Sequence, residues 1–143
     1  MKRWLVLLVL FAACRHAATP VGQPLTGAVA PRVAVEQFLS AVRAQDLQAM
    51  AVIWGNAKGP ARDQFDRTEL EKREIIMQSC LDHEKFRILN EAPGEGGQRV
   101  FRVELTKGTA TATPLLTTVK GPSERWYVTN AELAAAQPLC RQG

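Results

Sequence analysis

The spacing of the apolar residues changes once along this chain, from a helical period before residue 81 to alternation beyond residue 86. Between Pro31 and Gly55, apolar side chains recur at i, i+3, i+4 and i+7, which is the spacing of one helix face. The phase is lost at residues 44–46 and then restarts, so we expect two helical pieces or one bent helix. Pro31 suits the first helical position, because the N–H that proline lacks would have no partner there.

A second helix and a run of strands follow. Thr68 and Glu71 form the T-x-x-E pattern of a capping box, which predicts a helix through about Leu81. The stretches that read as strands are 86–88, 100–105, 110–120 and 124–130. Helices followed by about four antiparallel strands predict one α+β domain with its helices on one face of the sheet. The predicted core is Phe38, Leu39, Val42, Leu47, Met50, Leu70, Met77, Phe101, Val103 and Leu105.

Two stretches give this arrangement a resemblance to a known fold. AVEQFLSAVRAQDLQAM carries a helix, a break and a second helix, and ERWYVTNAEL reads as a terminal hairpin strand. Over roughly residues 31–131 the pattern resembles the nuclear transport factor 2-like fold, also called cystatin-like. The resemblance implies a curved sheet that wraps the helices and leaves a cone-shaped pocket. A fold of this kind does not by itself specify a function.

The first residues have the layout of an export signal. Lys2 and Arg3 precede an uncharged run of 11 residues, from Trp4 to Cys14. A membrane-spanning helix needs about 20 residues, so we expect a signal peptide rather than a permanent span.

Residues 11–14, Phe-Ala-Ala-Cys, resemble the lipobox of bacterial lipoproteins. The resemblance implies cleavage before Cys14 and attachment of acyl chains such as palmitate to that residue, so the membrane becomes a partner. The expected organisation is a signal at 1–13, a flexible tether at 14–30 and one domain at 31–143. Arg15 after the cysteine favours the outer membrane of a cell envelope that has one. The alternative is an ordinary secreted protein cut before Thr19.

Charge does not indicate a nucleic acid partner. The chain has a formal net charge of +4, and loss of Lys2 and Arg3 with the signal would lower it to +2. Basic and acidic residues alternate within residues 67–74, as on a solvated helix face.

Two cysteines, Cys80 and Cys140, remain beyond the lipidation site. An exported protein meets an oxidising compartment, so we expect a disulfide that closes a loop of about 60 residues. Two buried free thiols, or a free Cys140 on an extended tail, are the alternatives. With no C-x-x-C spacing and only His16 and His83 as histidines, we expect no metal and no cofactor.

Arg73 is the residue that most suggests a ligand. On a helix at about 100° per residue it falls inside the apolar arc formed by Leu70, Ile76, Met77 and Cys80. A charge there must reach the rim, pair with a carboxylate such as Glu104, or line a pocket that accepts an anion. The candidate pocket residues are Arg73, Trp54, Trp126 and Tyr127, although the last two should face opposite sides of their strand.

No residue of this chain can be assigned a catalytic role. Asp82, His83 and Glu84 form the single carboxylate–histidine cluster, but adjacent residues at a helix end diverge by about 100°. We therefore expect a non-catalytic, lipid-anchored envelope module that binds a small ligand or a protein. The alternatives are a small pocket enzyme of the isomerase or hydratase type and a structural protein that forms a homodimer. A carboxylate within about 3 Å of Tyr127 or Arg73 in a polar pocket would favour the enzyme, and a flat apolar patch with Trp126 would favour the dimer.

Overall fold

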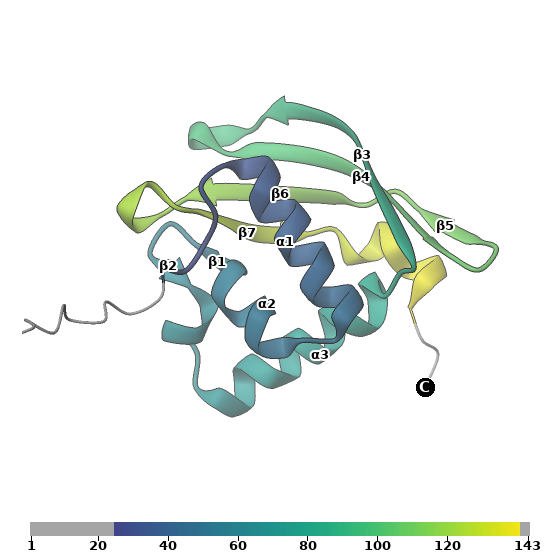
Figure 1. Cartoon of the computed structure of the whole chain (residues 1–143), viewed down its shortest axis with the longest axis horizontal. Coiled ribbons are helices and arrows are strands. Elements are labelled where there is room, and N and C mark those ends of the chain that lie inside the picture. The colour runs from purple at the N-terminus through teal and green to yellow at the C-terminus, as the bar shows by residue number, and fades with distance from the viewer. Residues whose placement is uncertain (1–24, 141–143) are drawn as a thin grey trace, which may run out of the picture.

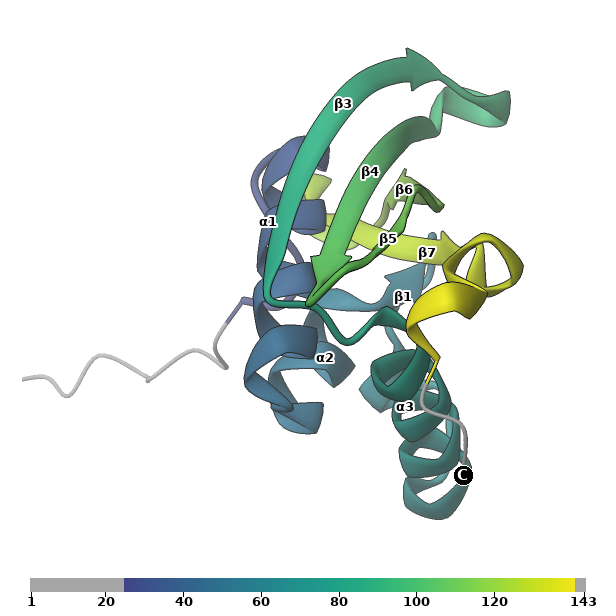
Figure 2. The same ribbon diagram turned by 90° about the vertical axis from the view of Figure 1, so that its right-hand side faces the viewer.

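The computed structural model describes residues 25–140, in which helices pack on one side of a curved antiparallel sheet (Figures 1 and 2). The helices are α1 (Pro31–Ala44), α2 (Leu47–Ile53) and α3 (Arg67–Leu81). The sheet strands are β3 (Lys85–Pro93), β4 (Arg99–Lys107), β5 (Ala110–Ala112), β6 (Leu115–Lys120) and β7 (Trp126–Ala131). A small ribbon of β1 (Gly55–Asn56) and β2 (Gly59–Pro60) follows α2. The short 3₁₀ segments are η1 (Ala61–Asp63), η2 (Glu95–Gly97), η3 (Pro122–Glu124) and η4 (Leu133–Leu139).

The predicted break between the first two helices is confirmed. Pro31 begins α1, and Gln45 ends it in the left-handed region, with φ of 55°. The side chain of Asp46 then accepts a 3.0 Å hydrogen bond from the backbone N–H of Ala49 and so caps α2. The polar residues that interrupt the apolar spacing are therefore the cap residues of the two helices.

The start of α3 differs from the prediction. The cap is Asp66, whose carboxylate accepts hydrogen bonds of 3.1 Å from the backbone N–H groups of Thr68 and Glu69. Thr68 and Glu71 lie inside the helix and do not form the expected capping box. Asp66 is the better cap because its carboxylate satisfies two of the unpaired N–H groups and carries negative charge at the positive end of the helix dipole.

The sheet order is β3-β4-β6-β7, with β5 paired to the end of β4. Register shifts interrupt the β3–β4 pairing at Ile88/Asn90 and the β6–β7 pairing at Thr117/Thr118. Such bulges bend strands and increase their twist, and Figure 2 shows β3 and β4 arching over the helices. Within the stretch 110–120 that reads as strand, Pro114 lies between β5 and β6.

The helices bury their apolar faces against the sheet. Phe38 and Leu39 of α1 and Phe101 and Val103 of β4 are fully buried in one cluster. The predicted core residues are all buried except Leu47, which is partly exposed at the first turn of α2. The α+β class, with helices packed on one face of the sheet, is thus confirmed.

The packed domain begins before Pro31, which corrects the boundary set by the predicted tether. The backbone of Ala28 exchanges two hydrogen bonds of 2.8 Å with that of Trp126, and Ala28 is fully buried. The hydroxyl groups of Thr26 and Tyr127 lie 2.8 Å apart. Residues 26–28 therefore cover one edge of β7, whereas residues 1–24, with Cys14 and the predicted signal, lie outside the described residues.

Gly27 allows the N-terminal segment to pack closely against β7. A Cβ atom added to Gly27 would lie 2.8 Å from the ring of Tyr127, and the φ of Gly27 is +69°. Glycine is required here because the backbone approaches a buried ring closely in a conformation that other residues rarely adopt.

The predicted disulfide between Cys80 and Cys140 is confirmed. It joins the last turn of α3 to the end of η4, which packs against α3 and β5. Leu139 and Ala136 of η4 are buried, so the C-terminal segment is part of the core. Within residues 25–140, none of the helices has the length and apolar character needed to cross a membrane.

Candidate ligand-binding site

The buried face of α3 is rotated relative to the predicted one. The buried residues are Leu70, Glu74, Met77, Gln78 and Leu81. Ile76 and its neighbour Ile75 are 56% and 50% exposed, respectively. The predicted arc gave weight to Ile76 because isoleucine is apolar, but the register of the helix is set by the i, i+4 spacing of the buried residues. Arg73 consequently lies at the edge of the buried face, with its side chain half exposed.

The guanidinium of Arg73 is held by two contacts. Its Nε donates a 2.6 Å hydrogen bond to Oε1 of Glu69, one turn earlier on α3. Its central carbon lies 4.8 Å from the centroid of the Phe65 ring, in a cation–π contact. The expected partner Glu104 instead accepts a 3.1 Å hydrogen bond from Arg87. Arg73 is therefore fixed on an aromatic ring instead of being paired across the core.

Phe65 also stacks on Trp54. The two ring centroids are 5.6 Å apart and the planes differ by 12°. Trp54 is the C-cap residue of α2, and it forms a bridge with Val128 of β7, which fixes its backbone beside the sheet. Sequence reasoning missed Phe65 because it lies in a polar connection; an isolated aromatic residue in such a connection was the available signal.

Two adjacent hollows lie beside Arg73, with volumes of about 370 and 220 Å³. Trp54, Arg73 and Thr129 line both of them. The larger hollow is also lined by Ile76, Met77, Asn130, Ala131 and Leu133. The smaller one is also lined by Gly55, Asn56, Ala61, Gln64 and Phe65. Thr129 is the residue of β7 at the register shift, where Val128 pairs with Thr118 and Asn130 with Thr117.

Among the described residues that line the two hollows, Arg73 is the one that carries charge. No carboxylate, histidine or tyrosine belongs to the lining of this part of the chain. Glu69 is within 3 Å of Arg73, but its side chain is 42% exposed and lies outside both linings. The hollows can therefore hold a ligand by stacking, apolar contact and one positive charge, whereas groups suited to proton transfer are not in contact with them.

The structure separates the four predicted pocket residues into two pairs. Trp54 and Arg73 lie together, as described above. Tyr127 is buried, and its hydroxyl meets Thr26 in the N-terminal segment. Trp126 packs against the main core, with the Lys120 ammonium 5.5 Å from its ring. Trp126 is therefore a packing residue and does not form an exposed apolar patch.

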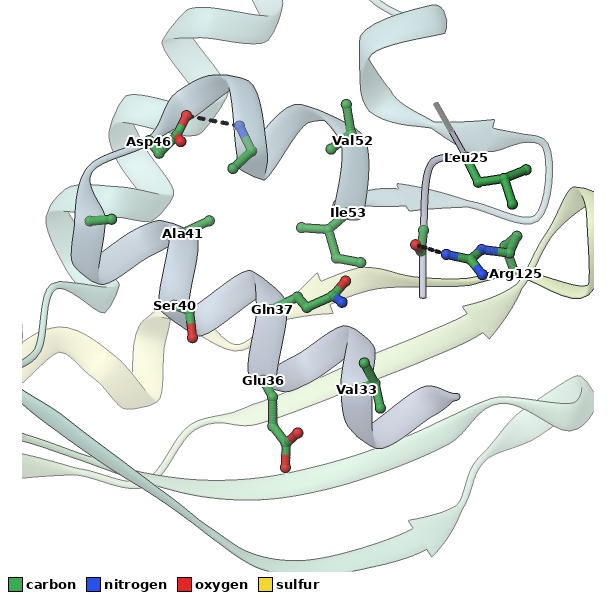
Figure 3. A pocket seen from close by; sticks show the side chains of 13 residues that line it. Leu25, Val33, Glu36, Gln37, Ser40, Ala41, Asp46, Val52, Ile53 and Arg125 are labelled. Atoms are coloured by element: carbon green, nitrogen blue, oxygen red, sulfur yellow. Dashed lines mark hydrogen bonds between the residues drawn. The ribbon is translucent and has the colours of Figure 1, made fainter. Parts of the chain in front are cut away.

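A larger and wider groove of about 610 Å³ lies between α1, α2 and the N-terminal segment (Figure 3). The three charged side chains of its lining make contacts within the protein. Arg125 donates hydrogen bonds to the carbonyl oxygens of Thr26 (3.1 Å) and Gly27 (2.7 Å), and Asp46 caps α2. Glu36 is paired with Arg32 at 3.2 Å. Within the residues that the structure describes, the groove has no aromatic side chain in its lining, and its charged side chains are two carboxylates, Glu36 and Asp46, and one arginine, Arg125.

The cluster at residues 82–84 is a junction between α3 and β3. His83 is buried, and its Nδ1 lies 2.8 Å from the carbonyl oxygen of Leu81. Burial lowers the pKa of His83, with the hydrogen bond to Leu81 opposing that effect. Asp82 accepts a 2.5 Å hydrogen bond from Lys107. Asp82 and His83 thus have different partners, Lys107 and the backbone of Leu81.

Glu74 is a buried acid that sequence reasoning did not single out. It is 2% exposed, and its Oε1 has no hydrogen-bond partner. Burial, and secondarily the charge of Glu71, raise the pKa of Glu74 to about 7. It lines a cavity of about 90 Å³ with Arg67 and Gln48, which is separate from the hollows at Arg73.

No protein-family model and no curated protein matches this chain. Among solved structures, the chain is similar to an NTF-2-like protein of unknown function from Shewanella oneidensis MR-1. The two share 18% sequence identity over 70% of this chain and 92% of that one, with a TM-score of 0.42. The chemistry of the site is accordingly derived from the residues of this chain alone.

Proposed function

We propose that the protein is a lipid-anchored binding module of the bacterial cell envelope, which holds a small ligand in the hollows beside Arg73 without transforming it. The observation that carries the proposal is the stack of Arg73, Phe65 and Trp54 beside two hollows. Ligand sites usually combine aromatic and apolar walls with a few polar groups that fix orientation. The hollows have this composition, with Thr129 and Asn130 as neutral polar groups.

The absence of an acid or base from the described lining supports binding without catalysis. An isomerase or hydratase must move a proton, which requires a titratable group within hydrogen-bond reach of the ligand. Glu74 has a pKa suited to such a task, but it faces the separate cavity of about 90 Å³. That volume corresponds to about three water molecules, which is too small for a substrate of either enzyme class.

The anchor rests on the sequence of the first residues. Lys2, Arg3, the uncharged run and the lipobox-like residues 11–14 support lipid attachment at Cys14. Twelve positions separate Cys14 from Thr26, where the packed domain begins. Several acyl chains on one residue provide a stable anchor, since each buried CH₂ contributes about 0.8 kcal/mol.

Binding can be tested by native mass spectrometry of the full chain extracted gently from its own membranes. We expect a small molecule to accompany the protein and to be lost in Thr129→Leu, because Thr129 lines both hollows and leucine replaces its hydroxyl with a bulkier apolar group. Thr106→Leu is the matched control, since Thr106 is a partly buried threonine of β4 that lines neither hollow. Retention of the same small molecule by Thr129→Leu, or extraction of the wild type with no bound molecule, would contradict the proposal.

A further inference from the structure

We infer that the ligand class of the Arg73 hollows is a small organic carboxylate that carries a flat apolar body. This inference rests on the proposed function, because it specifies the chemistry of the same site. It follows from the charge of the lining, the unused donors of Arg73 and the shape of the apolar walls.

The lining of the two hollows carries a positive charge. Arg73 is the one charged side chain in the lining of the described hollows, so its field is not balanced from within them. Its partner Glu69 lies outside, and both side chains of that pair are about half exposed. An exposed pair of this kind contributes little net energy, because water screens it. Glu69 therefore orients Arg73, and a ligand that covers the guanidinium would exclude the water that screens its charge.

Arg73 has N–H groups that its contact with Glu69 does not use. A guanidinium has five N–H donors, and the contact with Glu69 uses the one on Nε. The two terminal nitrogens of Arg73 have no acceptor among the hydrogen bonds of the described residues. Two parallel N–H groups match the two oxygens of a carboxylate, and a single arginine balances a single negative charge. A phosphate dianion would call for further cations, and neither hollow has a second one in its described lining.

The side chain of Arg73 is ordered by its aromatic neighbours before any ligand binds. The guanidinium carbon of Arg73 lies over the Phe65 ring, 4.8 Å from its centroid, and Trp54 stacks on Phe65. Binding then requires little further ordering of the long Arg73 side chain, which would otherwise reduce the affinity. A ligand bound by the terminal nitrogens would lie beside the indole of Trp54, which lines both hollows.

The walls of the larger hollow indicate the kind of body that the ligand carries. The larger hollow has apolar walls from Ile76, Met77 and Leu133. Ile76 is 56% exposed, so a bound apolar group can remove part of its side chain from water. The volume of about 370 Å³ corresponds to about a dozen water molecules. A body of that size, such as one phenyl ring on a short chain, fits between these walls and the indole.

The test compares 3-phenylpropionate with 3-phenylpropionamide, which has the same shape but no charge. Affinities for the purified full chain are measured by titration calorimetry in the same buffer. We expect the carboxylate to bind at least ten times more tightly, because a hydrogen-bonded ion pair with Arg73 is lost in the amide. The carboxylate should also lose affinity as the salt concentration rises, whereas the amide should not.

Arg73→Gln should reduce the preference for the carboxylate to less than twofold and leave the affinity for the amide nearly unchanged. Arg87→Gln is the matched control, since Arg87 is also an exposed arginine paired with a glutamate but lies on β3. It should keep the wild-type preference. Circular dichroism of both variants confirms that they are folded.

The outcomes separate this inference from the proposed function. Equal affinities for the two compounds, both lost in Thr129→Leu, would overturn the carboxylate inference and leave the binding function standing. A carboxylate preference that persists in Arg73→Gln would place the anion elsewhere and overturn it as well. Failure of both compounds to bind would also overturn it, whereas the binding function is judged by the native ligand and its loss in Thr129→Leu.

Discussion

At the scale of single residues, the sequence correctly placed Arg73 on the helix that became α3. It placed Arg73 inside the buried face of that helix, whereas the side chain lies at the edge of that face and is half exposed. Ile76, a member of the predicted apolar arc, lies on a side of α3 that is exposed, while Glu74 lies on the buried side. A polar residue on a buried face cannot be recognised from periodicity, because periodicity assigns faces from apolar residues. The stack of Phe65 on Trp54 could not be predicted from the sequence either, because it depends on how a loop folds back onto α2.

Glu74 makes stability depend on pH in a defined direction. The folded protein keeps the proton of this carboxyl group up to about pH 7, whereas the unfolded chain releases it near pH 4.5. Stability from this group is therefore complete below pH 4.5 and is lost as the pH rises through about 7, by about 3 kcal/mol in total.

Glu74→Gln should remove this loss, because glutamine is similar in shape and does not ionise. We expect the variant to be more stable than wild type at pH 8 and to show a flatter profile between pH 4.5 and 8. Urea unfolding across this range measures the difference, with Glu95→Gln, at an exposed glutamate of η2, as the control. If the wild-type and Glu74→Gln profiles run parallel, Glu74 does not titrate as a buried acid.

At the scale of elements, helix and strand order follow from the sequence, but the contacts of the chain ends do not. The break at 44–46 and the end of α3 were predictable because cap residues and apolar spacing agree there. The packing of residues 26–28 on β7 was not, because Gly27 and Ala28 look like linker residues until the ring of Tyr127 is placed beside them.

Gly27→Ala tests this N-terminal contact. The added methyl group would lie 2.8 Å from the ring of Tyr127 in a left-handed conformation. We expect a loss of about 2–4 kcal/mol in unfolding free energy. Gly108→Ala is the matched control, because Gly108 has a φ of +56° with no atoms within 4 Å, so it should lose about 1 kcal/mol. Equal losses at both positions would mean that the close approach to Tyr127 is not maintained in solution.

The disulfide gives a second prediction for an element, η4. Cys80–Cys140 closes a loop with a sequence separation of 60. On the chain-entropy model it contributes roughly 4 kcal/mol. Reduction should therefore lower the melting temperature and expose the segment after Asn130 to proteases. A reduced protein that melts at the same temperature and resists cleavage beyond Asn130 would show that the buried residues of η4 hold it without the bridge.

At the scale of the whole molecule, the proposed lipid anchor at Cys14 precedes the domain that carries the proposed binding site. Cys14→Ser should leave an uncut precursor that does not label with radioactive palmitate, because the thiol is the expected acceptor. Cys80→Ser should still label, since Cys80 is bonded to Cys140 within the domain. Labelling of the Cys14→Ser protein would assign the lipid to another residue and remove the anchor from the proposal.

We propose that the ligand binds beside Trp54 and Arg73 and not in the wider groove between α1 and α2. The most direct measurement is a nitrogen–proton correlation spectrum of the full chain during titration with 3-phenylpropionate. We expect shifts of the Trp54 indole N–H and the Thr129 amide, with the Trp126 indole unchanged. Shifts confined to groove residues such as Gln37 and Ser40, with Trp54 unchanged, would contradict it.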